Sequence, residues 1–390
     1  MEYDFNQIID RQNTWSIKYN MSAYGKPADA LPLWVADMDF QAPAGVIDAL
    51  CSQSRHGVYG YSNTDKSYFD VLQKWFAQRF GWHVEEDWLV KTHGVVNAIY
   101  TAVYAFTEPG QSVIIQQPVY YPFAASIKRT DRRLIINHLR YENNRYTVDL
   151  DDFEKKITQH HVKLFILCNP HNPVGRVWTS EELTAIAEIC LRHGVLVVAD
   201  EIHHDFIYPG HRHTVFSELT PDCRDITITC TAPSKTFNLA GLQVSNIFIT
   251  NSSLRNRFSY EYARGGLAHI NVMGIVACKA AYEEGEEWLE QLLRYLADNR
   301  SVLRQFFTNT VPQVKLIEPE GTYLAWLDFR GLGLDKLELD RLITHKAKLW
   351  LSEGANFGAK GAGFMRLNFA CPRGILEEAL TRLDKAIHNA

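Results

Sequence analysis

The sequence lacks the features of membrane-spanning, secreted and nucleic-acid-binding proteins. None of its apolar runs approaches the roughly 20 residues that a membrane-spanning helix needs. The first residues show neither the basic segment nor the apolar segment of a secretory signal. Its 40 Lys and Arg residues against 45 Asp and Glu residues give a net charge of −5, without the basic excess that nucleic acids and anionic membranes attract. We therefore expect neither nucleic acid nor a membrane as a partner.

Cysteine is also scarce. The seven cysteines are an odd number, are widely scattered and include no Cys-x-x-Cys motif. This pattern argues against a disulfide framework or a zinc ribbon, and a reducing cytoplasm is the expected location. The stretch that contains His203, His204, Asp205, His211 and His213 lacks the spacing of metal ligands, so no metal site is predicted.

The composition is that of a globular protein with a large core. Hydrophobic residues make up 46% of the 390 residues and charged residues 22%, which are typical proportions for such proteins. At roughly 100–200 residues per domain, this length predicts two or three domains. Aromatic residues make up 12%, enough to serve both in the core and on a surface that binds a planar ring.

The clearest local pattern is a β-α-β unit in the middle of the chain. An apolar strand is predicted over 163–168, and a second one over 195–199 that ends on Asp200. Between them, Thr179 and Glu182 form a capping box at the start of a helix with apolar residues at helical spacing. Strands that alternate with helices in this way favour a parallel sheet.

The rest of the chain extends this pattern and then departs from it. Further strands are predicted over 113–116, 134–137, 226–230 and 246–249, and a helix is predicted after Gly94. After about residue 284, a long helix over 288–307 and alternating strands over 322–328 and 364–369 are typical of an α+β domain. We therefore predict an α/β protein whose large domain holds a mostly parallel sheet between helices, accompanied by a smaller α+β domain.

Three polar side chains stand at or after the ends of predicted strands: Asn172, Asp200 and Lys235. Each has an ordinary structural explanation, since asparagine shapes turns, aspartate caps turns and lysine is usually solvated. Ligands of parallel sheets, however, bind beyond the carboxyl ends of the strands. A lysine that forms a Schiff base, with an aspartate for a pyridinium nitrogen, is the pair that pyridoxal 5′-phosphate (PLP) requires. Together the three side chains predict a PLP site.

Four motifs in this order resemble the fold-type I PLP-dependent aminotransferases. They are Asn172-Pro173-Val174-Gly175, Asp200-Glu201-Ile202-His203, Ser234-Lys235 and Arg366. A narrower resemblance is to the MalY/PatB-type cystathionine β-lyases, which are carbon–sulfur lyases. It is carried by Trp34-Val35-Ala36-Asp37-Met38-Asp39-Phe40, Gly57-Val58-Tyr59-Gly60-Tyr61 and the segments 200–203, 232–238, 364–368 and 371–373, and it covers nearly the whole chain.

The resemblance implies how the chain would hold PLP. Lys235 would carry the cofactor as a Schiff base, Asp200 would pair with its pyridine nitrogen, and Asn172 would hydrogen-bond its ring hydroxyl. Tyr120 matches the aromatic residue that stacks on the cofactor ring, with Tyr121 as the alternative if the register differs by one. Without the resemblance, core packing would explain either tyrosine.

The phosphate of the cofactor needs hydrogen-bond donors. Gly94, Val95 and Val96 open a helix, whose free N–H groups and dipole favour an anion. Ser234 can add a hydroxyl, and the resemblance implies that Tyr61 reaches the phosphate from a partner subunit. The expected assembly is therefore a homodimer with shared active sites.

Two positions depart from the general aminotransferase pattern. Gln243 stands where many of these enzymes carry a basic residue, eight positions after the lysine. His203 replaces a tyrosine, and either a cofactor contact or a buried structural histidine would explain it. Both residues agree with the lyase subgroup.

The substrate would be held by residues from both ends of the chain. Arg366 matches the residue that binds the substrate α-carboxylate, because a planar guanidinium forms two parallel hydrogen bonds with it; an ion pair at a strand end is the alternative. Ala36 lies in the N-terminal segment that approaches the substrate in the resembled family. The resemblance implies a large PLP-binding domain over 50–285 and a small domain built from 1–49 and 286–390.

The predicted reaction is β-elimination from a sulfur-containing L-amino acid, with Lys235 as the general base. The resemblance implies L-cystathionine or a related L-cysteine conjugate as substrate, a thiol such as homocysteine with pyruvate and ammonia as products, and a place in methionine biosynthesis. A PLP-dependent aminotransferase of class I/II is the alternative, since it shares every cofactor contact. An additional regulatory role through a protein partner would leave no mark on these motifs.

Overall fold

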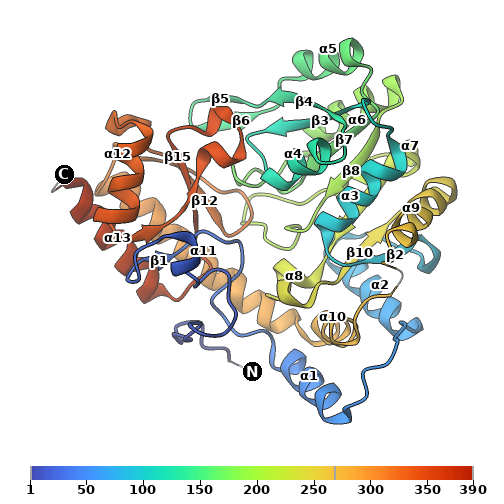
Figure 1. The fold of residues 1–390 in the computed structure, drawn as a ribbon, viewed down its shortest axis with the longest axis horizontal. Coiled ribbons are helices and arrows are strands. Elements are labelled where there is room, and N and C mark those ends of the chain that lie inside the picture. Colours follow the sequence, from blue (N-terminus) through green and yellow to red (C-terminus); the bar gives the residue numbers. More distant parts are fainter. Residues whose placement is uncertain (1, 268, 389–390) are drawn as a thin grey trace.

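The fold consists of two main β-sheets with helices packed against them. It is described by a computed structural model over residues 2–267 and 269–388. The larger sheet has seven strands in the order β2-β10-β9-β8-β7-β3-β4 (Figure 1). They are β2 (Leu89–Thr92), β3 (Ser112–Gln117), β4 (Arg133–His138), β7 (Leu164–Cys168), β8 (Leu196–Asp200), β9 (Thr227–Thr231) and β10 (Ser245–Phe248).

The larger sheet is mostly parallel, as the alternation of strands and helices predicts. β4, β3, β7, β8 and β9 run parallel to one another, whereas β10 runs antiparallel to both β9 and β2. Alternate residues of β7 enter different cores: Leu164 and Ile166 pack on one face, and Phe165 and Leu167 on the other. Both faces are therefore covered, which is the usual state of a parallel sheet.

Helices cover the two faces of this sheet. One core cluster includes α3 (Val95–Phe106), α4 (Tyr121–Lys128) and α9 (Ser252–Arg264), and the other includes α5 (Leu150–His160), α6 (Ser180–His193) and α7 (Pro221–Ile226). The predicted capping box of α6 is confirmed. The Glu182 N–H donates to the Thr179 hydroxyl at 3.2 Å, and the Thr179 N–H donates to the Glu182 carboxylate at 2.9 Å.

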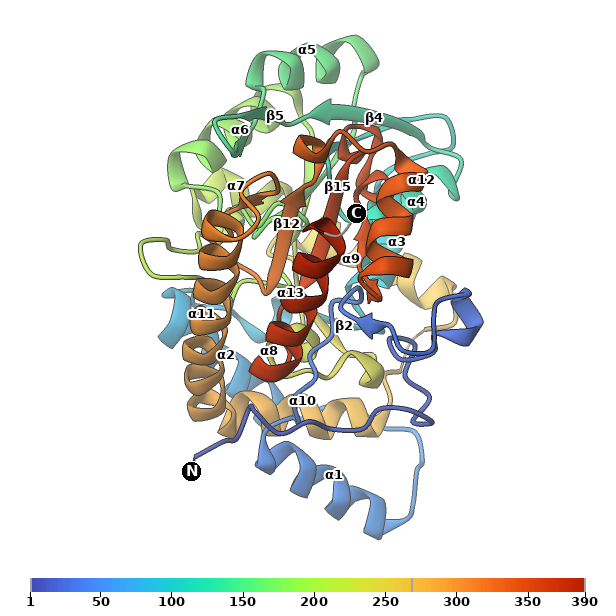
Figure 2. The ribbon, with the colours of Figure 1, turned by 90° about the vertical axis from the view of Figure 1, so that its left-hand side faces the viewer.

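A smaller antiparallel sheet lies beside the large one. It has the order β11-β12-β15-β14, with β11 (Lys315–Ile317), β12 (Leu324–Asp328), β14 (Ser352–Glu353) and β15 (Phe364–Asn368). The helices α11 (Glu286–Asn309), α12 (Lys336–Asp340) and α13 (Arg373–His388) lie on the side that faces the viewer in Figure 2. Trp326 and Phe364 join the core cluster that holds α5 and α6, so the small sheet packs against the large part of the molecule. The predicted long helix and alternating strands are confirmed.

The N-terminal segment lies with the C-terminal part of the chain. β1 (Leu31–Pro32) pairs in parallel with β13 (Leu349–Trp350). Asn368, the last residue of β15, donates hydrogen bonds to the carbonyl oxygens of Val35 and Asp37 at 2.6 Å each. Both ends of the chain therefore contribute to this part of the molecule (Figure 2).

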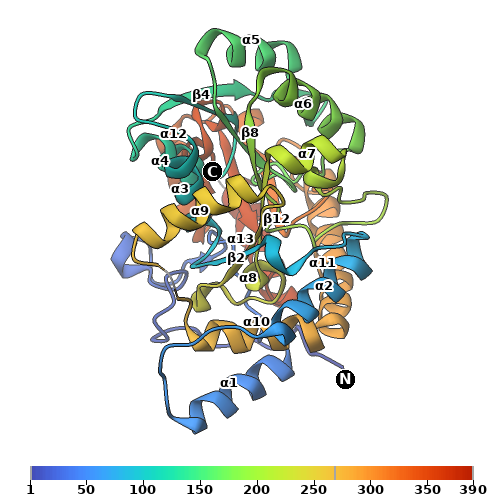
Figure 3. The ribbon, with the colours of Figure 1, turned by 90° about the vertical axis from the view of Figure 1, so that its right-hand side faces the viewer.

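Two helices pack on α10 (Val272–Glu284) at one end of the molecule. They are α1 (Ala44–His56) and α2 (Lys66–Phe80). The connection between them, residues 57–65, runs along the outside of the molecule (Figure 3), and Tyr61 in this connection is 99% exposed. Among the described residues, no helix combines the length and apolar character that crossing a membrane requires.

Candidate active site

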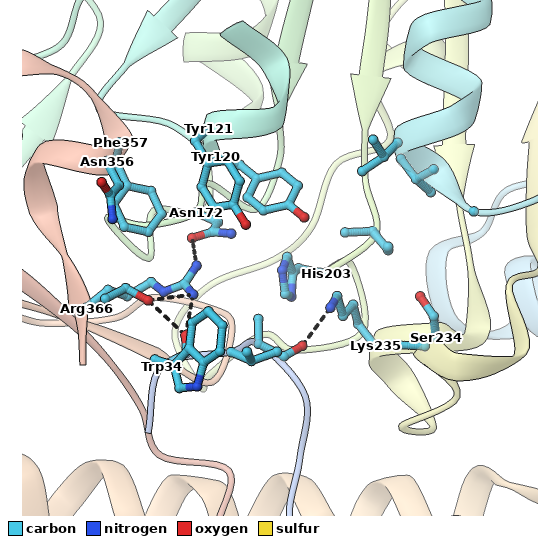
Figure 4. A pocket seen from close by; sticks show the side chains of 18 of the residues that line it. Trp34, Tyr120, Tyr121, Asn172, His203, Ser234, Lys235, Asn356, Phe357 and Arg366 are labelled. Atoms are coloured by element: carbon cyan, nitrogen blue, oxygen red, sulfur yellow. Dashed lines mark hydrogen bonds between the residues drawn. The ribbon is translucent and has the colours of Figure 1, made fainter. Parts of the chain in front are cut away.

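A cavity of about 740 Å³ lies where the large sheet, the N-terminal segment and the small sheet meet. It is lined by every predicted site residue except Tyr61, namely Ala36, Gly94, Val95, Val96, Tyr120, Asn172, Asp200, His203, Ser234, Lys235 and Arg366. Figure 4 shows His203 between Lys235 and Arg366. Residues from both chain ends and from the middle thus converge on one space.

The topology of the large sheet brings the first three predicted residues together. β7, β8 and β9 are neighbours and run parallel, so their carboxyl ends meet at one edge. Asn172 follows β7, Asp200 ends β8, and Lys235 lies in α8 (Pro233–Thr236), the short helix after β9. This is the edge at which open parallel sheets bind ligands.

Asp200 is a buried carboxyl group whose negative charge is only partly balanced by its neighbours. It is 4% exposed, and the Ile202 N–H donates to it at 3.2 Å. Burial raises the pKa of Asp200 to about 7, although this hydrogen bond and Lys235 act to lower it. A cationic partner would restore the ionised form, and the protonated ring nitrogen of PLP is such a partner.

Lys235 is an amine that loses its proton readily. Its Nζ donates to the carbonyl oxygen of Ala36 at 2.6 Å. Burial lowers the pKa of Lys235 to about 8. The carboxylates of Asp37 and Asp200 oppose this change, and Arg366 adds to it. Because the free amine is the form that attacks a carbonyl group, the aldehyde of PLP fits this side chain.

Arg366, on β15, is a buried cation at the cavity. Its Nη1 donates to Asn172 Oδ1 at 2.9 Å, and its Nη2 donates to the Trp34 carbonyl at 2.7 Å. Its Nε is buried and has no hydrogen-bond partner among the described residues. Burial lowers the pKa of Arg366 to about 10, so the guanidinium stays charged at neutral pH. A carboxylate that enters the cavity would meet a cation with an unused donor.

His203 lies in the cavity as a neutral ring. It is 3% exposed, and its Nδ1 has no hydrogen-bond partner within the described part of the chain. Burial lowers the pKa of His203 well below its usual range, and the positive charges of Lys235 and Arg366 add to this effect. The ring nitrogen can therefore hydrogen-bond a ligand in the cavity.

Two other histidines of this stretch, His204 and His213, have structural partners, whereas His211 is exposed. His204 Nε2 lies 3.1 Å from the Asp205 carboxylate, and His213 Nε2 lies 2.9 Å from the Glu201 carboxylate. In residues 2–267 and 269–388, no group of three or more His, Cys, Asp or Glu side chains is placed to hold a metal ion.

The start of α3 is shaped to receive an anion. Gly94, at the N-cap, has a φ of +87°, which residues other than glycine rarely adopt. No side chain of the described residues caps this helix, and the first N–H groups of an α-helix have no partner within the helix. Gln243 lies next to Gly94, since a Cβ on Gly94 would be 3.5 Å from Gln243 Oε1. Gln243 is uncharged, so this position offers no cation to a phosphate. A phosphate here would instead be bound by backbone N–H groups and the Ser234 hydroxyl.

Two adjacent tyrosines line the cavity. The Tyr120 N–H donates to the Asn172 carbonyl at 3.1 Å, which ties this residue to the loop after β7. Tyr121 is 53% exposed, whereas Tyr120 is partly buried. The two ring centroids are 5.4 Å apart. The stacking role predicted for Tyr120 stays a prediction, and its deeper position favours it over Tyr121.

The sequence did not reveal a cluster of three further aromatic residues at the cavity. Trp34 and Trp350 stack with ring centroids 4.3 Å apart, and the Tyr24 centroid lies 5.3 Å from each. All three line the cavity, and Tyr24 is 51% exposed. They meet because β1 pairs with β13. The single signal in the sequence was the position of Trp34 in the N-terminal motif.

Tyr61 lies away from the cavity. It is 99% exposed, and its ring centroid lies 5.8 Å from that of His269. A role of Tyr61 at the cavity therefore requires a second chain.

The fold and the cavity define a member of the aminotransferase class I and II family, which matches residues 32–383. The chain belongs to this family, and the predicted fold-type I architecture is confirmed.

Within the family the chain is similar to PatB, a cystathionine β-lyase of Bacillus subtilis (strain 168). The two are 42% identical over 386 residues, which are 98% of this chain and 100% of PatB. The chain is also 32% identical to the protein MalY of Escherichia coli (strain K12) over 389 residues, 99% of each chain. Among solved structures, cystalysin from Treponema denticola, which contains a PLP cofactor, is similar with a TM-score of 0.96 and 39% identity over 100% of both chains. The predicted resemblance to MalY and PatB is confirmed.

Proposed function

We propose that this protein is a PLP-dependent carbon–sulfur lyase. It would convert L-cystathionine, or a related L-cysteine conjugate, and water into a thiol, pyruvate and ammonia. Similarity over the full length to PatB supports this proposal. The observation that carries it is the convergence in one cavity of the Asp200 carboxyl group, the Lys235 amine and the Arg366 guanidinium. These groups match the needs of a PLP enzyme that acts on an amino acid.

The cofactor would be held by residues at the edge of the large sheet. Lys235 would bind its aldehyde carbon covalently, and Asp200 would pair with its ring nitrogen. Asn172 would hydrogen-bond the ring hydroxyl, His203 would contact the same side of the ring, and Tyr120 would stack on its face. The raised pKa of Asp200 and the lowered pKa of Lys235 support this placement, because both groups lack full compensation in the protein alone.

The phosphate would lie at the N-terminus of α3. Gly94, Val95 and Val96 would supply backbone N–H groups, and Ser234 would supply a hydroxyl. We propose that Tyr61 of a second copy completes this site, so that the protein acts as a homodimer with shared active sites. Its nearly complete exposure, beside an exposed Val58 and Tyr59, supports this proposal.

The mechanism divides the work between a carboxylate-binding residue and a proton carrier. Bound PLP supplies a protonated ring that accepts the electron pair left when the substrate loses its Cα proton. Arg366 would hold the α-carboxylate of the substrate. Lys235, released by the substrate amine, would take the Cα proton and then deliver a proton to the departing sulfur as the Cβ–S bond breaks. Asp200 would keep the ring nitrogen protonated throughout.

One incubation separates the lyase from the aminotransferase. The purified protein, loaded with PLP, is mixed with L-cystathionine in the absence of any 2-oxo acid, and pyruvate and free thiol are measured. Equal amounts of pyruvate and thiol over many turnovers are expected. Turnover that requires an added 2-oxo acid would contradict the lyase and favour a class I/II aminotransferase. Absence of turnover under both conditions would contradict both enzymes and point to a binding role.

The division into domains and the location are also proposals. We propose a large domain over 50–285 and a small domain from 1–49 and 286–390, because α11 begins at Glu286 and β1 pairs with β13. A reducing cytoplasm is supported by the seven free cysteines, six of which are buried. A role in methionine biosynthesis follows if homocysteine is the thiol released.

A further inference from the structure

The segment 34–40 forms part of one wall of the cavity and is clamped by a side chain from the other end of the chain. The Asn368 amide donates to the carbonyl oxygens of Val35 and Asp37 at 2.6 Å each. These carbonyls belong to the residues on either side of Ala36. The position of the Ala36 carbonyl is therefore fixed from both sides.

The same segment is tied to the turn that carries the lysine. Asn238 accepts a hydrogen bond from the Met38 N–H at 3.0 Å. Its amide also donates to the carbonyls of Met38 and Phe40, at 2.9 and 2.8 Å. Asn238 stands three residues after Lys235. Its hydrogen bonds therefore fix the position of the segment 34–40 relative to the turn that carries the lysine.

The Ala36 carbonyl oxygen accepts two hydrogen bonds at this place. Lys235 Nζ donates at 2.6 Å, and the Tyr323 hydroxyl donates at 3.0 Å. Tyr323 is fully buried, and burial raises the pKa of its phenol, so the hydroxyl remains a donor at physiological pH. The carbonyl is thus a fixed acceptor for the amine of Lys235.

The residue after Ala36 brings a negative charge to the back of this wall. Arg11 Nη2 donates to Asp37 Oδ2 at 3.0 Å, and Nη1 donates to Oδ1 at 3.2 Å. Lys18 Nζ lies 3.5 Å from the Asp37 carboxylate and 2.7 Å from that of Asp39. Asp37 and Arg11 line a separate pocket. The Asp37 side chain therefore points to this second pocket, and its negative charge still favours the ammonium form of Lys235. Its backbone carbonyl is held by Asn368.

Four charged or ionisable groups, besides the Tyr323 phenol, surround the amine of Lys235. Asp37 and Asp200, at the end of β8, favour its ammonium form, whereas Arg366 on β15 disfavours it. His203 is neutral because burial lowers its pKa. Under the proposed function, Asp200 is engaged by the ring nitrogen of the cofactor, which leaves Asp37 as the carboxylate that balances a proton on the lysine.

We propose that Asp37, fixed by Arg11, is a positioning residue that stabilises the ammonium form of Lys235 against the Ala36 carbonyl. In the cofactor-free protein the lysine would rest there as an ammonium group. During turnover it would return there each time it takes a proton from the substrate. This catalytic consequence rests on the proposed function. The effect of Asp37 on the protonation of Lys235 does not, because it depends only on the residues described.

The protonation of Lys235 can be measured without substrate or cofactor. The full chain, freed of PLP, is treated with trinitrobenzenesulfonate across neutral and alkaline pH, and modification of the peptide that contains Lys235 is followed by mass spectrometry. Asp37→Asn should make Lys235 about fivefold more reactive at pH ~7, the change expected when loss of one negative charge lowers its pKa from about 8 by roughly one. Arg11→Gln should slow the reaction several-fold, because the Asp37 charge is then less offset.

Two controls separate charge from structure. Asp37→Glu keeps the charge and should react within about twofold of the wild-type rate. Asp39→Asn breaks contacts to Arg11 at 2.6 Å and Lys18 at 2.7 Å in the same cluster. It leaves the Asp37 charge in place, so its rate should also stay within about twofold. Thermal unfolding shows which variants are folded.

Unchanged reactivity in Asp37→Asn would overturn the proposal. So would a change of the same sign in Asp37→Asn, Arg11→Gln and Asp39→Asn, since that result would indicate loosening of the cluster rather than loss of one charge. If Asp37→Asn does not fold, the sign of the Arg11→Gln effect decides. The measurement uses no substrate, so its failure is distinct from an absence of lyase turnover.

Discussion

The two walls of the cavity are built in different ways. The first wall consists of Asn172, Asp200 and Lys235, which stand at the carboxyl ends of three neighbouring strands. The facing wall is assembled from distant parts of the chain: Arg366 donates to the carbonyl of Trp34, 332 positions away. The first wall follows from the order of strands in one sheet, whereas the second exists only when both chain ends have folded together.

The walls also differ in how their charges are compensated. In the first wall, burial raises the pKa of Asp200 to about 7 and lowers the pKa of Lys235 to about 8. In the second, the carboxylate of Asp37 is paired with Arg11 at 3.0 Å, and Arg366 is the group left incompletely compensated, since burial lowers its pKa to about 10. Buried charges that the protein balances only in part indicate where a ligand binds and supplies the missing partner. Buried charges that are paired within the protein indicate the structure that supports this site.

The largest effect is expected from removing the amine of the first wall. Lys235→Ala should lower pyruvate release from L-cystathionine by about 10³-fold or more, because the general base and the covalent anchor are lost together. Lys163→Ala is a matched control, since Lys163 is an exposed lysine just before β7. Similar losses in both variants would contradict a specific role of Lys235.

Two buried aspartates five positions apart should respond in opposite ways. Asp200→Asn should lower turnover by roughly 10²-fold or more, yet stabilise the cofactor-free protein at pH ~8 by about 2–4 kcal/mol. The reason is that the raised pKa of Asp200, about 7, makes its ionisation costly in the folded state. Stability from this group is present at low pH and is lost as the pH rises through about 7.

Asp205→Asn is the matched comparison. Burial acts to raise the pKa of Asp205, but His204, Arg79 and Thr236 together lower it to about 2. Its stabilising effect is therefore present at neutral pH and is lost only as the pH falls through about 2, so the substitution should destabilise the protein by about 1–3 kcal/mol. Denaturant unfolding of both cofactor-free variants at pH ~6 and ~8 measures these effects. Destabilisation of both at pH ~8 would contradict the distinction between ligand-completed and scaffold charges.

A smaller effect is expected at the substrate side of the second wall. Arg366→Lys should raise KM by roughly 10–100-fold with a lesser change in kcat, because an ammonium group cannot reproduce two parallel hydrogen bonds to a carboxylate. Steady-state kinetics with L-cystathionine measures this. Arg373→Lys is the control, since Arg373 donates to Asn299 at 2.7 Å at the start of α13 and should leave KM within about twofold. An unchanged KM in Arg366→Lys would place the α-carboxylate elsewhere.

The smallest effect on turnover is expected from removing the Asn368 side chain, which holds the N-terminal segment of the second wall in place. Asn368→Ala removes both hydrogen bonds to the 34–37 segment and should destabilise the protein by about 1–3 kcal/mol, with a loss of turnover well below that of Lys235→Ala. Thermal unfolding and pyruvate release are measured together. A turnover as low as that of Lys235→Ala would show that the second wall takes part directly in the chemistry.

The first wall could be predicted from the sequence because its geometry is local. A strand, a turn-rich loop and a capped helix are visible between residues 163 and 194, and parallel strands must place their carboxyl ends at one edge. The positions of Asn172, Asp200 and Lys235 follow from that rule. Their specific roles came from the resemblance to a family rather than from the pattern of strands.

The second wall could not be predicted because it has no local pattern. β1 and β13 have two residues each, and neither shows the alternation by which strands are identified. The stacking of Trp34 on Trp350 accompanies the pairing of these short strands. The hydrogen bonds from Asn368 join β15 to Val35 and Asp37, more than 300 positions away. Arg366 and Ala36 were placed at the site by resemblance, and their partners became visible only in three dimensions.

The most direct test of the site is to find which lysine carries the cofactor. The PLP-loaded protein is reduced with borohydride, which makes the bond between lysine and cofactor permanent, and is then digested and mapped by mass spectrometry. The cofactor mass is expected on the peptide that contains Lys235 and should be absent from the Lys235→Ala variant. Cofactor attached to a different lysine, or no attachment in the wild-type protein, would contradict the proposed active site.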